Sequence, residues 1–71
     1  NLNLLEGEYG KHPDGTWYAC PPGKPDLLAN LGGHEVREHE DGSITVSPSI
    51  RVWNHTGEWH GYLEHGRWRL A

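Results

Sequence analysis

The residues in this chain whose types could bind a metal are one cysteine and six histidines, which is a high number for 71 residues. A structural zinc site needs three or four such ligands at bonding distance. None of these residues has the spacing of a zinc finger or of a helical zinc-protease motif. The ligand set that we consider is Cys20 with His34 and His60, joined by His12. In the alternative, His60 packs beside Tyr62 and most of the other histidines occupy turns and solvent.

The sequence contains no complete catalytic signature. A cysteine nucleophile needs a histidine base and a donor to the oxyanion, but Cys20 precedes Pro21 and Pro22, whose nitrogens cannot donate hydrogen bonds. Glu58 and Glu64 could form the carboxylate pair of a glycoside hydrolase, yet so short a chain leaves little room for a sugar cleft. We therefore expect a protein that is not an enzyme.

Charge and cysteine content narrow the classes of function. The formal net charge is −4, and the basic residues are scattered singly apart from Arg67 and Arg69. We therefore expect no nucleic-acid partner, because such binding requires clustered Lys and Arg. No apolar run is long enough to span a membrane, so we expect no membrane association. A single cysteine allows no intrachain disulfide and is typical of a reducing cytoplasm.

The middle of the chain predicts a hairpin with an acidic tip. A three-residue loop that ends at Gly42, with this glycine in the left-handed conformation of a bulge, pairs Val36 with Val46 and Glu38 with Ile44. A two-residue turn would instead mix apolar and charged residues on one face. We expect the acidic side chains at this tip to be solvated or, in the alternative, to mimic the phosphate charge of a nucleic acid. They are Glu38, Glu40 and Asp41.

The last third of the chain predicts a second hairpin, with His65-Gly66 as a two-residue turn. This turn pairs Leu63 with Trp68. One face is then apolar and consists of Trp59, Gly61, Leu63, Trp68 and Leu70. The other face carries the polar side chains of His60, Tyr62, Glu64, Arg67 and Arg69. Opposite charges across such a face stabilise an antiparallel pair.

The remaining segments complete the predicted fold. A short helix is expected near residues 25–31, because Pro25 suits the first helical position and Gly32 with Gly33 suits its end. Residues 1–10 are expected to form an edge strand or a loosely docked tail. We expect residues 1–71 to be one small, mainly β domain. Its architecture would be an antiparallel curled sheet or half-open barrel of about five short strands, with the one short helix.

Three short motifs stand in the second half of the chain: Ser47-Pro48-Ser49-Ile50, Trp59-His60-Gly61-Tyr62-Leu63, and Gly66 with Trp68. Together, over residues 34–70, they resemble a family of small domains of unknown function common in bacteriophages, some of whose members are mislabelled ammonia monooxygenase. Many members of that family look like metal binders with a Cys-x-x-Cys pair and a later Cys-His pair. Cys20 and His60 match two of those positions, whereas positions 23 and 59 carry Gly and Trp. The resemblance implies a phage origin and a location in the bacterial host cytoplasm or in the virion.

These observations predict a non-enzymatic, phage-type module that binds a protein of the host or of the virion, as an accessory protein or a small virion component. A homo-oligomer is compatible with this prediction, and no cofactor is expected. The predicted binding surface combines residue types enriched at binding hot spots with the acidic tip. Its residues are His60, Tyr62, Arg67, Arg69, Glu38, Glu40 and Asp41.

Two other functions stay open at this point. One is a zinc-binding domain, structural or hydrolytic, on the ligand set named above. The other is a module that binds carbohydrate or cell wall, in which exposed tryptophans stack on sugar rings.

Overall fold

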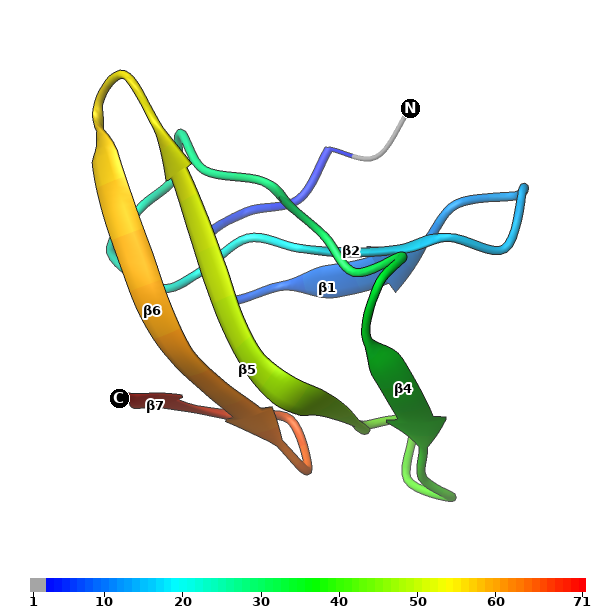
Figure 1. The fold of residues 1–71 in the computed structure, drawn as a ribbon. Coiled ribbons are helices and arrows are strands. Elements are labelled where there is room, and N and C mark those ends of the chain that lie inside the picture. The colour runs from blue at the N-terminus through cyan, green and yellow to red at the C-terminus, as the bar shows by residue number, and fades with distance from the viewer. Residues whose placement is uncertain (1–2) are drawn as a thin grey trace.

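The computed structural model describes residues 3–71, which form seven strands in two antiparallel sheets (Figure 1). The first sheet, in the order β1-β2-β3, consists of β1 (Tyr9–Lys11), β2 (Trp17–Ala19) and β3 (Ala29–Asn30). The second, in the order β4-β5-β6-β7, consists of β4 (Glu35–Glu38), β5 (Ile44–Asn54), β6 (Gly57–Glu64) and β7 (Arg67–Leu70). Neither sheet closes on itself. The predicted mainly β, antiparallel and unclosed fold is confirmed.

The core lies between the two sheets, whose strands cross in Figure 1. Ala19 and Ala29 contribute from the first sheet, while Ile44, Ile50 and Leu63 contribute from the second, and each of these side chains is at most 3% exposed. On β5 and β6 the buried residues alternate with exposed ones, because successive side chains of a strand point to opposite faces. One face of the four-stranded sheet therefore packs on the core. We call the opposite face the outer face.

Both predicted hairpins have the predicted register. Val36 pairs with Val46 and Glu38 with Ile44, and Gly42 has a φ of 88°. In the last hairpin Leu63 pairs with Trp68. The two residues of its turn, at positions 65 and 66, both have positive φ, at 49° and 76°, as a two-residue turn of the type that matches strand twist requires.

One member of the predicted apolar face is not buried, because Leu70 is 70% exposed. Gly61 lies opposite it on β6, and the Trp59 indole covers this glycine so closely that a Cβ there would lie 2.5 Å from it. Trp59 packs edge-on against Trp68 at a centroid distance of 5.1 Å. The two indoles fill the core side of this hairpin, and Leu70 stays at the free edge of the sheet.

The predicted helix near residues 25–31 was wrong, and residues 3–71 contain no helix. Leu27, Ala29 and Leu31 are buried, whereas Leu28 and Asn30 are exposed. This is the period of two that a strand requires, and it outweighs the helix signals of the flanking proline and glycines. The described part of the chain therefore has no helix that could cross a membrane.

Of the segment 1–10, for which we expected an edge strand or a docked tail, only residues 9 and 10 belong to the edge strand β1, and residues 1 and 2 lie outside the described residues. The segment before β1 is docked. Gly7 donates its N–H to the carbonyl of Cys20 at 2.7 Å, and its own carbonyl accepts from the Trp68 indole N–H at 3.0 Å.

Candidate functional site

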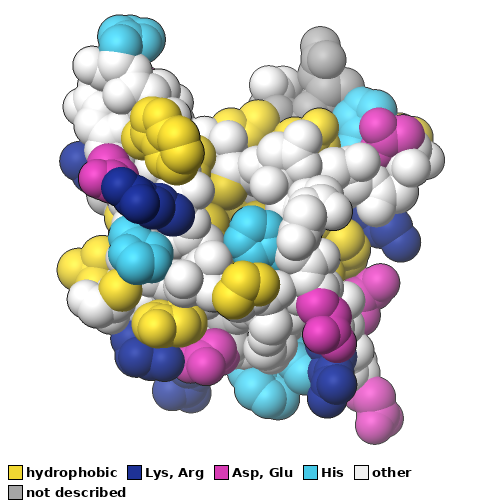
Figure 2. Space-filling view, in the orientation of Figure 1, with side chains coloured by type: hydrophobic (Ala, Val, Ile, Leu, Met, Phe, Trp, Pro, Cys, Tyr) yellow, Lys and Arg dark blue, Asp and Glu magenta, His cyan; other side chains and the backbone are white. Residues whose placement is uncertain are grey.

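Polar and charged side chains gather on the outer face of the four-stranded sheet. Figure 2 shows histidine, basic and acidic side chains beside exposed apolar ones on the side of the molecule where β5 and β6 lie. Several come from positions whose chain neighbours are buried: Ser49 and Arg51 flank Ile50 on β5, and His60 lies between Trp59 and Gly61 on β6. The alternation that builds the core thus also presents these groups on the opposite face.

A bulge interrupts the pairing of β5 with β6 at the Ser-Pro-Ser motif. Val46 pairs with Leu63 and Ile50 pairs with Gly61, so residues 47–49 lie opposite Tyr62 alone. The peptide bond between residues 47 and 48 is cis. Extra residues in one strand leave part of the ladder unpaired, bend the strand and change the direction of a side chain. Here the side chain at the end of the bulge is that of Ser49.

Ser49 and His60 form a hydrogen-bonded pair on the outer face. The distance from Ser49 Oγ to His60 Nε2 is 3.1 Å. Ser49 is half-buried and His60 is exposed, so a ligand can approach both groups from solvent. A serine hydroxyl that donates to a histidine nitrogen within 2.6–3.2 Å is the arrangement of a nucleophile and its general base.

A second histidine contacts the same serine from its other side. His34 Nε2 lies 3.1 Å from the carbonyl oxygen of Ser49. Since a carbonyl only accepts, this nitrogen must carry the proton and donate. His34 Nδ1 is buried and has no hydrogen-bond partner within residues 3–71. The backbone and the side chain of Ser49 are therefore held by two different histidines.

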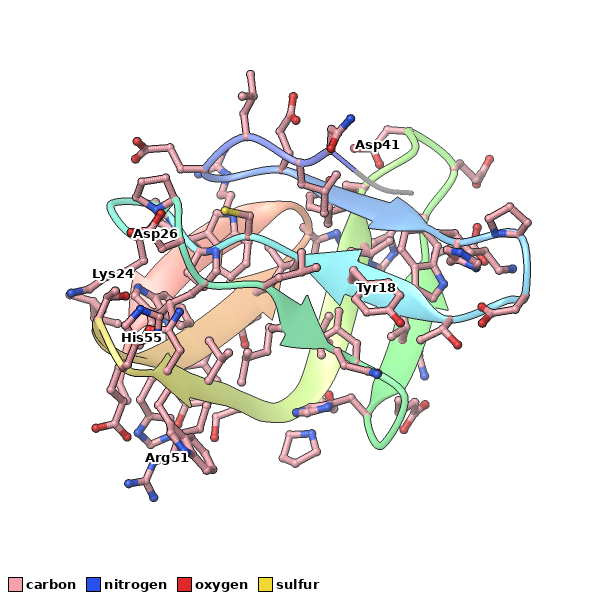
Figure 3. The ribbon with its side chains drawn as sticks, turned by 90° about the horizontal axis from the view of Figure 1, so that it is seen from above. Tyr18, Lys24, Asp26, Asp41, Arg51 and His55 are labelled. Carbon is pink, nitrogen blue, oxygen red and sulfur yellow. The ribbon has the colours of Figure 1, made fainter. Side chains whose placement is uncertain are left out.

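Beyond His60 toward the β5–β6 turn, the outer face carries a cation and an exposed indole. Arg51 pairs with His60 across the strands, and its guanidinium binds the carboxylate of Glu58. It also lies 5.6 Å from the centroid of the Trp53 ring, and Trp53 is 67% exposed. Figure 3 shows the Arg51 side chain pointing away from the body of the molecule.

Toward the opposite end of β5, the face is hollowed to a volume of about 260 Å³. Within this hollow the rings of His39 and His65 stack at a centroid distance of 3.9 Å. Thr45 Oγ1 bonds to His39 Nε2 at 2.7 Å and accepts the N–H of His65 at 3.0 Å. The residues that line the hollow are Glu35, Arg37, His39, Thr45, Ser47 and His65.

The four predicted metal ligands do not converge. Cys20 is buried, with its Sγ 3.6 Å from the carbonyl of Lys24, and His12 Nδ1 contacts Asp14. His34 and His60 both face Ser49 but bind different atoms of it. Residues 3–71 contain no group of three or more histidine, cysteine or carboxylate side chains that could hold a metal.

The predicted binding surface divides into two parts. The first part lies on the last hairpin, whose outer face carries the expected residues His60, Tyr62, Arg67 and Arg69. The Arg69 guanidinium lies 4.3 Å from the centroid of the Tyr62 ring. Glu38, Glu40 and Asp41 are exposed at or beside the β4–β5 turn. Ser43 donates its hydroxyl and its N–H to the Asp41 carboxylate, and these bonds lower the pKa of Asp41. What this surface binds stays a prediction.

The sequence interpretation missed Ser49 as a functional residue. The Ser-Pro-Ser motif was noted, but it has no fixed spacing to a base. Its partner is eleven residues away on the next strand, where Arg51 pairs with His60 and so places Ser49 diagonally across from this histidine on the same face.

A family model matches almost the whole chain. The family model described as "Bacterial ubiquitination-like system serine protease (BubE)" matches residues 3–71. No curated protein and no solved structure matches the chain.

This match corrects several expectations drawn from the sequence. The assignment to a phage family of unknown function was wrong, because the matching family is described as part of a bacterial ubiquitination-like system, and nothing links the chain to a phage. The prediction of a non-enzymatic binding module was also wrong, because that family is named as a serine protease. A ubiquitination-like system does support a protein as the class of partner.

Proposed function

The chain belongs to the family of the bacterial ubiquitination-like system serine protease (BubE), and from this premise we propose that it hydrolyses acyl bonds with Ser49 as the nucleophile and His60 as the general base. The observation that carries the proposal is the 3.1 Å contact between Ser49 Oγ and His60 Nε2. Ser43 and Ser47 are the other serines of the chain. Within residues 3–71 the Ser43 hydroxyl binds the Asp41 carboxylate, and neither hydroxyl has a hydrogen bond to a histidine ring.

The proposed reaction has two steps. In the first, His60 Nε2 takes the hydroxyl proton as Ser49 Oγ attacks the carbonyl carbon, and His60 then gives this proton to the leaving amine. The product is an ester of Ser49. In the second step His60 takes a proton from water, the resulting hydroxide attacks the ester carbon, and the proton returns to Ser49 Oγ. Both steps need only the acyl substrate and water.

The bulge supplies a candidate donor for the oxyanion. Pro48 has no N–H, and Ser49 has no register partner on β4 or β6. We assign its N–H to the negative oxygen of the tetrahedral intermediate, since backbone donors aimed at a developing charge are worth on the order of 10²–10³ in rate.

The shape of the site favours a protein substrate. His60 is exposed on an open sheet face, whereas sites for small molecules are concave and bury most of the ligand. We propose that the acyl group is contributed by a ubiquitin-like protein or its conjugate, which is the substrate class that the family's description suggests. The predicted docking residues Tyr62 and Arg69 lie on the same face, on β6 and β7.

The proposal is tested with a fluorophosphonate probe, which labels serines activated by a base. We expect the full chain to be labelled, Ser49→Ala to be unlabelled, and His60→Gln to react slower by on the order of 10²–10⁴. Ser47→Ala is the matched control for the serine and His55→Gln for the histidine, because both are exposed side chains outside the pair. Undiminished labelling of Ser49→Ala would refute the assignment.

A further inference from the structure

We propose that His34 is a positioning residue that holds the peptide of Ser49 so that the serine hydroxyl points at His60. This inference depends on the proposed function, since it assigns to His34 a task that matters only if Ser49 reacts. It concerns a side chain that touches neither the substrate nor the reacting atoms.

The bulge creates the need for such a residue. A strand residue normally has its carbonyl fixed by the ladder, but Ser49 has no register partner on either neighbouring strand. The bond from His34 Nε2 to the Ser49 carbonyl, at 3.1 Å, replaces the missing ladder bond. Rotation of this peptide would carry Oγ away from His60, so one hydrogen bond fixes the direction of the side chain.

The other end of this connection is anchored in the core. His34 donates its backbone N–H to the carbonyl of Leu31 at 3.0 Å, and the Leu31 side chain is 2% exposed. His34 therefore connects Leu31, a buried residue of the segment that follows β3, to the bulge on β5. A group held at both ends can keep the Ser49 peptide in place.

The unpartnered nitrogen of His34 supports a specific role for this ring. With the proton on Nε2, Nδ1 is an acceptor that is buried without a partner among the described residues, and a buried polar atom without a hydrogen bond is unfavourable. An apolar side chain would fill the same space without that cost. The feature that an apolar residue lacks is the Nε2–H donor, and this donor is bound to Ser49.

The test compares substitutions that differ in this donor. In His34→Gln the side-chain amide can place an N–H near the position of Nε2, whereas His34→Leu keeps the size and removes the donor. The readouts are the maximal labelling rate and the half-saturating concentration of the fluorophosphonate, measured on the full chain with the melting temperature as the check of folding.

We expect His34→Leu to lower the maximal rate about 30–100-fold with an unchanged half-saturating concentration, because a misplacement of about 1 Å costs on the order of 10²-fold. We expect His34→Gln to restore most of that rate. If His34→Leu does not fold, His34→Asn replaces it, since its shorter amide reaches the position of Nδ1 and not that of Nε2.

Full labelling of a folded His34→Leu, or equal losses in His34→Gln and His34→Leu, would overturn the inference. Neither result would touch the proposed function, which fails instead if Ser49→Ala is still labelled.

Discussion

Gly61 is the position where the smallest change to this chain should have the largest effect on stability. An added Cβ would lie 2.3 Å from the carbonyl oxygen of Arg69 and 2.5 Å from Cη2 of Trp59. Gly61 pairs with Ile50 on one side and Leu70 on the other, so it stands in the centre of the sheet. We predict that Gly61→Ala destabilises the fold by overpacking.

The size of the destabilisation follows from the two contacts that must open to admit the Cβ. A Cβ needs more than about 3.4 Å of room, so both contacts must open by about 1 Å. The Arg69 oxygen belongs to the backbone of β7 and cannot rotate away, while the Trp59 indole is held against Trp68. Overpacking of this kind costs roughly 1–3 kcal/mol. For a domain of this size, each kcal/mol lowers the melting temperature by about 4–8 °C.

The assay is thermal and urea denaturation followed by tryptophan fluorescence, with Gly33→Ala as the matched control. An added Cβ at Gly33 meets nothing within 4 Å, and its backbone is not in the left-handed region. We therefore expect Gly33→Ala to be neutral or to stabilise by up to about 1 kcal/mol. If Gly61→Ala melts at the same temperature as Gly33→Ala, the close packing of Trp59 and β7 on this glycine is refuted.

Two further predictions address the segment at residues 27–31, which contains β3, and the cysteine. Leu27→Ala should lower the free energy of unfolding by about 2–5 kcal/mol because Leu27 is 2% exposed. Leu28→Ala should change it by less than about 0.5 kcal/mol. If urea denaturation shows that both variants lose a similar amount of stability, the result would instead support a helix. Burial raises the pKa of the Cys20 thiol, with Glu6 and Glu8 adding to the effect, so less of the reactive thiolate forms in the native protein than in the unfolded chain at the same pH. Alkylation of Cys20 by iodoacetamide at pH 8 should be more than about 100-fold slower in the native protein than in guanidinium, and equal rates would contradict the buried position.

Sequence patterns predicted the fold wherever the evidence was local. The turn residues Gly42 and His65-Gly66 fixed the registers of both hairpins, because a positive φ at a given position selects one loop length. The segment around Leu27 was misread, since three leucines within five residues fit one helical face as well as a strand that alternates. Only the presence of the second sheet decides which side chains are buried.

Function was predicted less well than fold because the reacting groups are not local. The metal ligands were chosen by residue type, and Cys20 and His12 proved to have partners of their own. The absence of a contiguous catalytic motif was taken to exclude an enzyme. A serine and a histidine on adjacent strands, however, leave no signature at a fixed spacing.

The amino-acid sequence by itself determined the alternation of buried and exposed side chains, the two turns and thus the pairing of the hairpins, because these depend on residues a few positions apart. The tertiary structure decided how the unpaired residues of the bulge are held. Ser49 meets His60 because the pairing of β5 with β6 sets them diagonally across from each other on one face, and its carbonyl meets His34 because the segment after β3 packs against β5. These contacts depend on the balance of packing over the whole core, which no local spacing encodes.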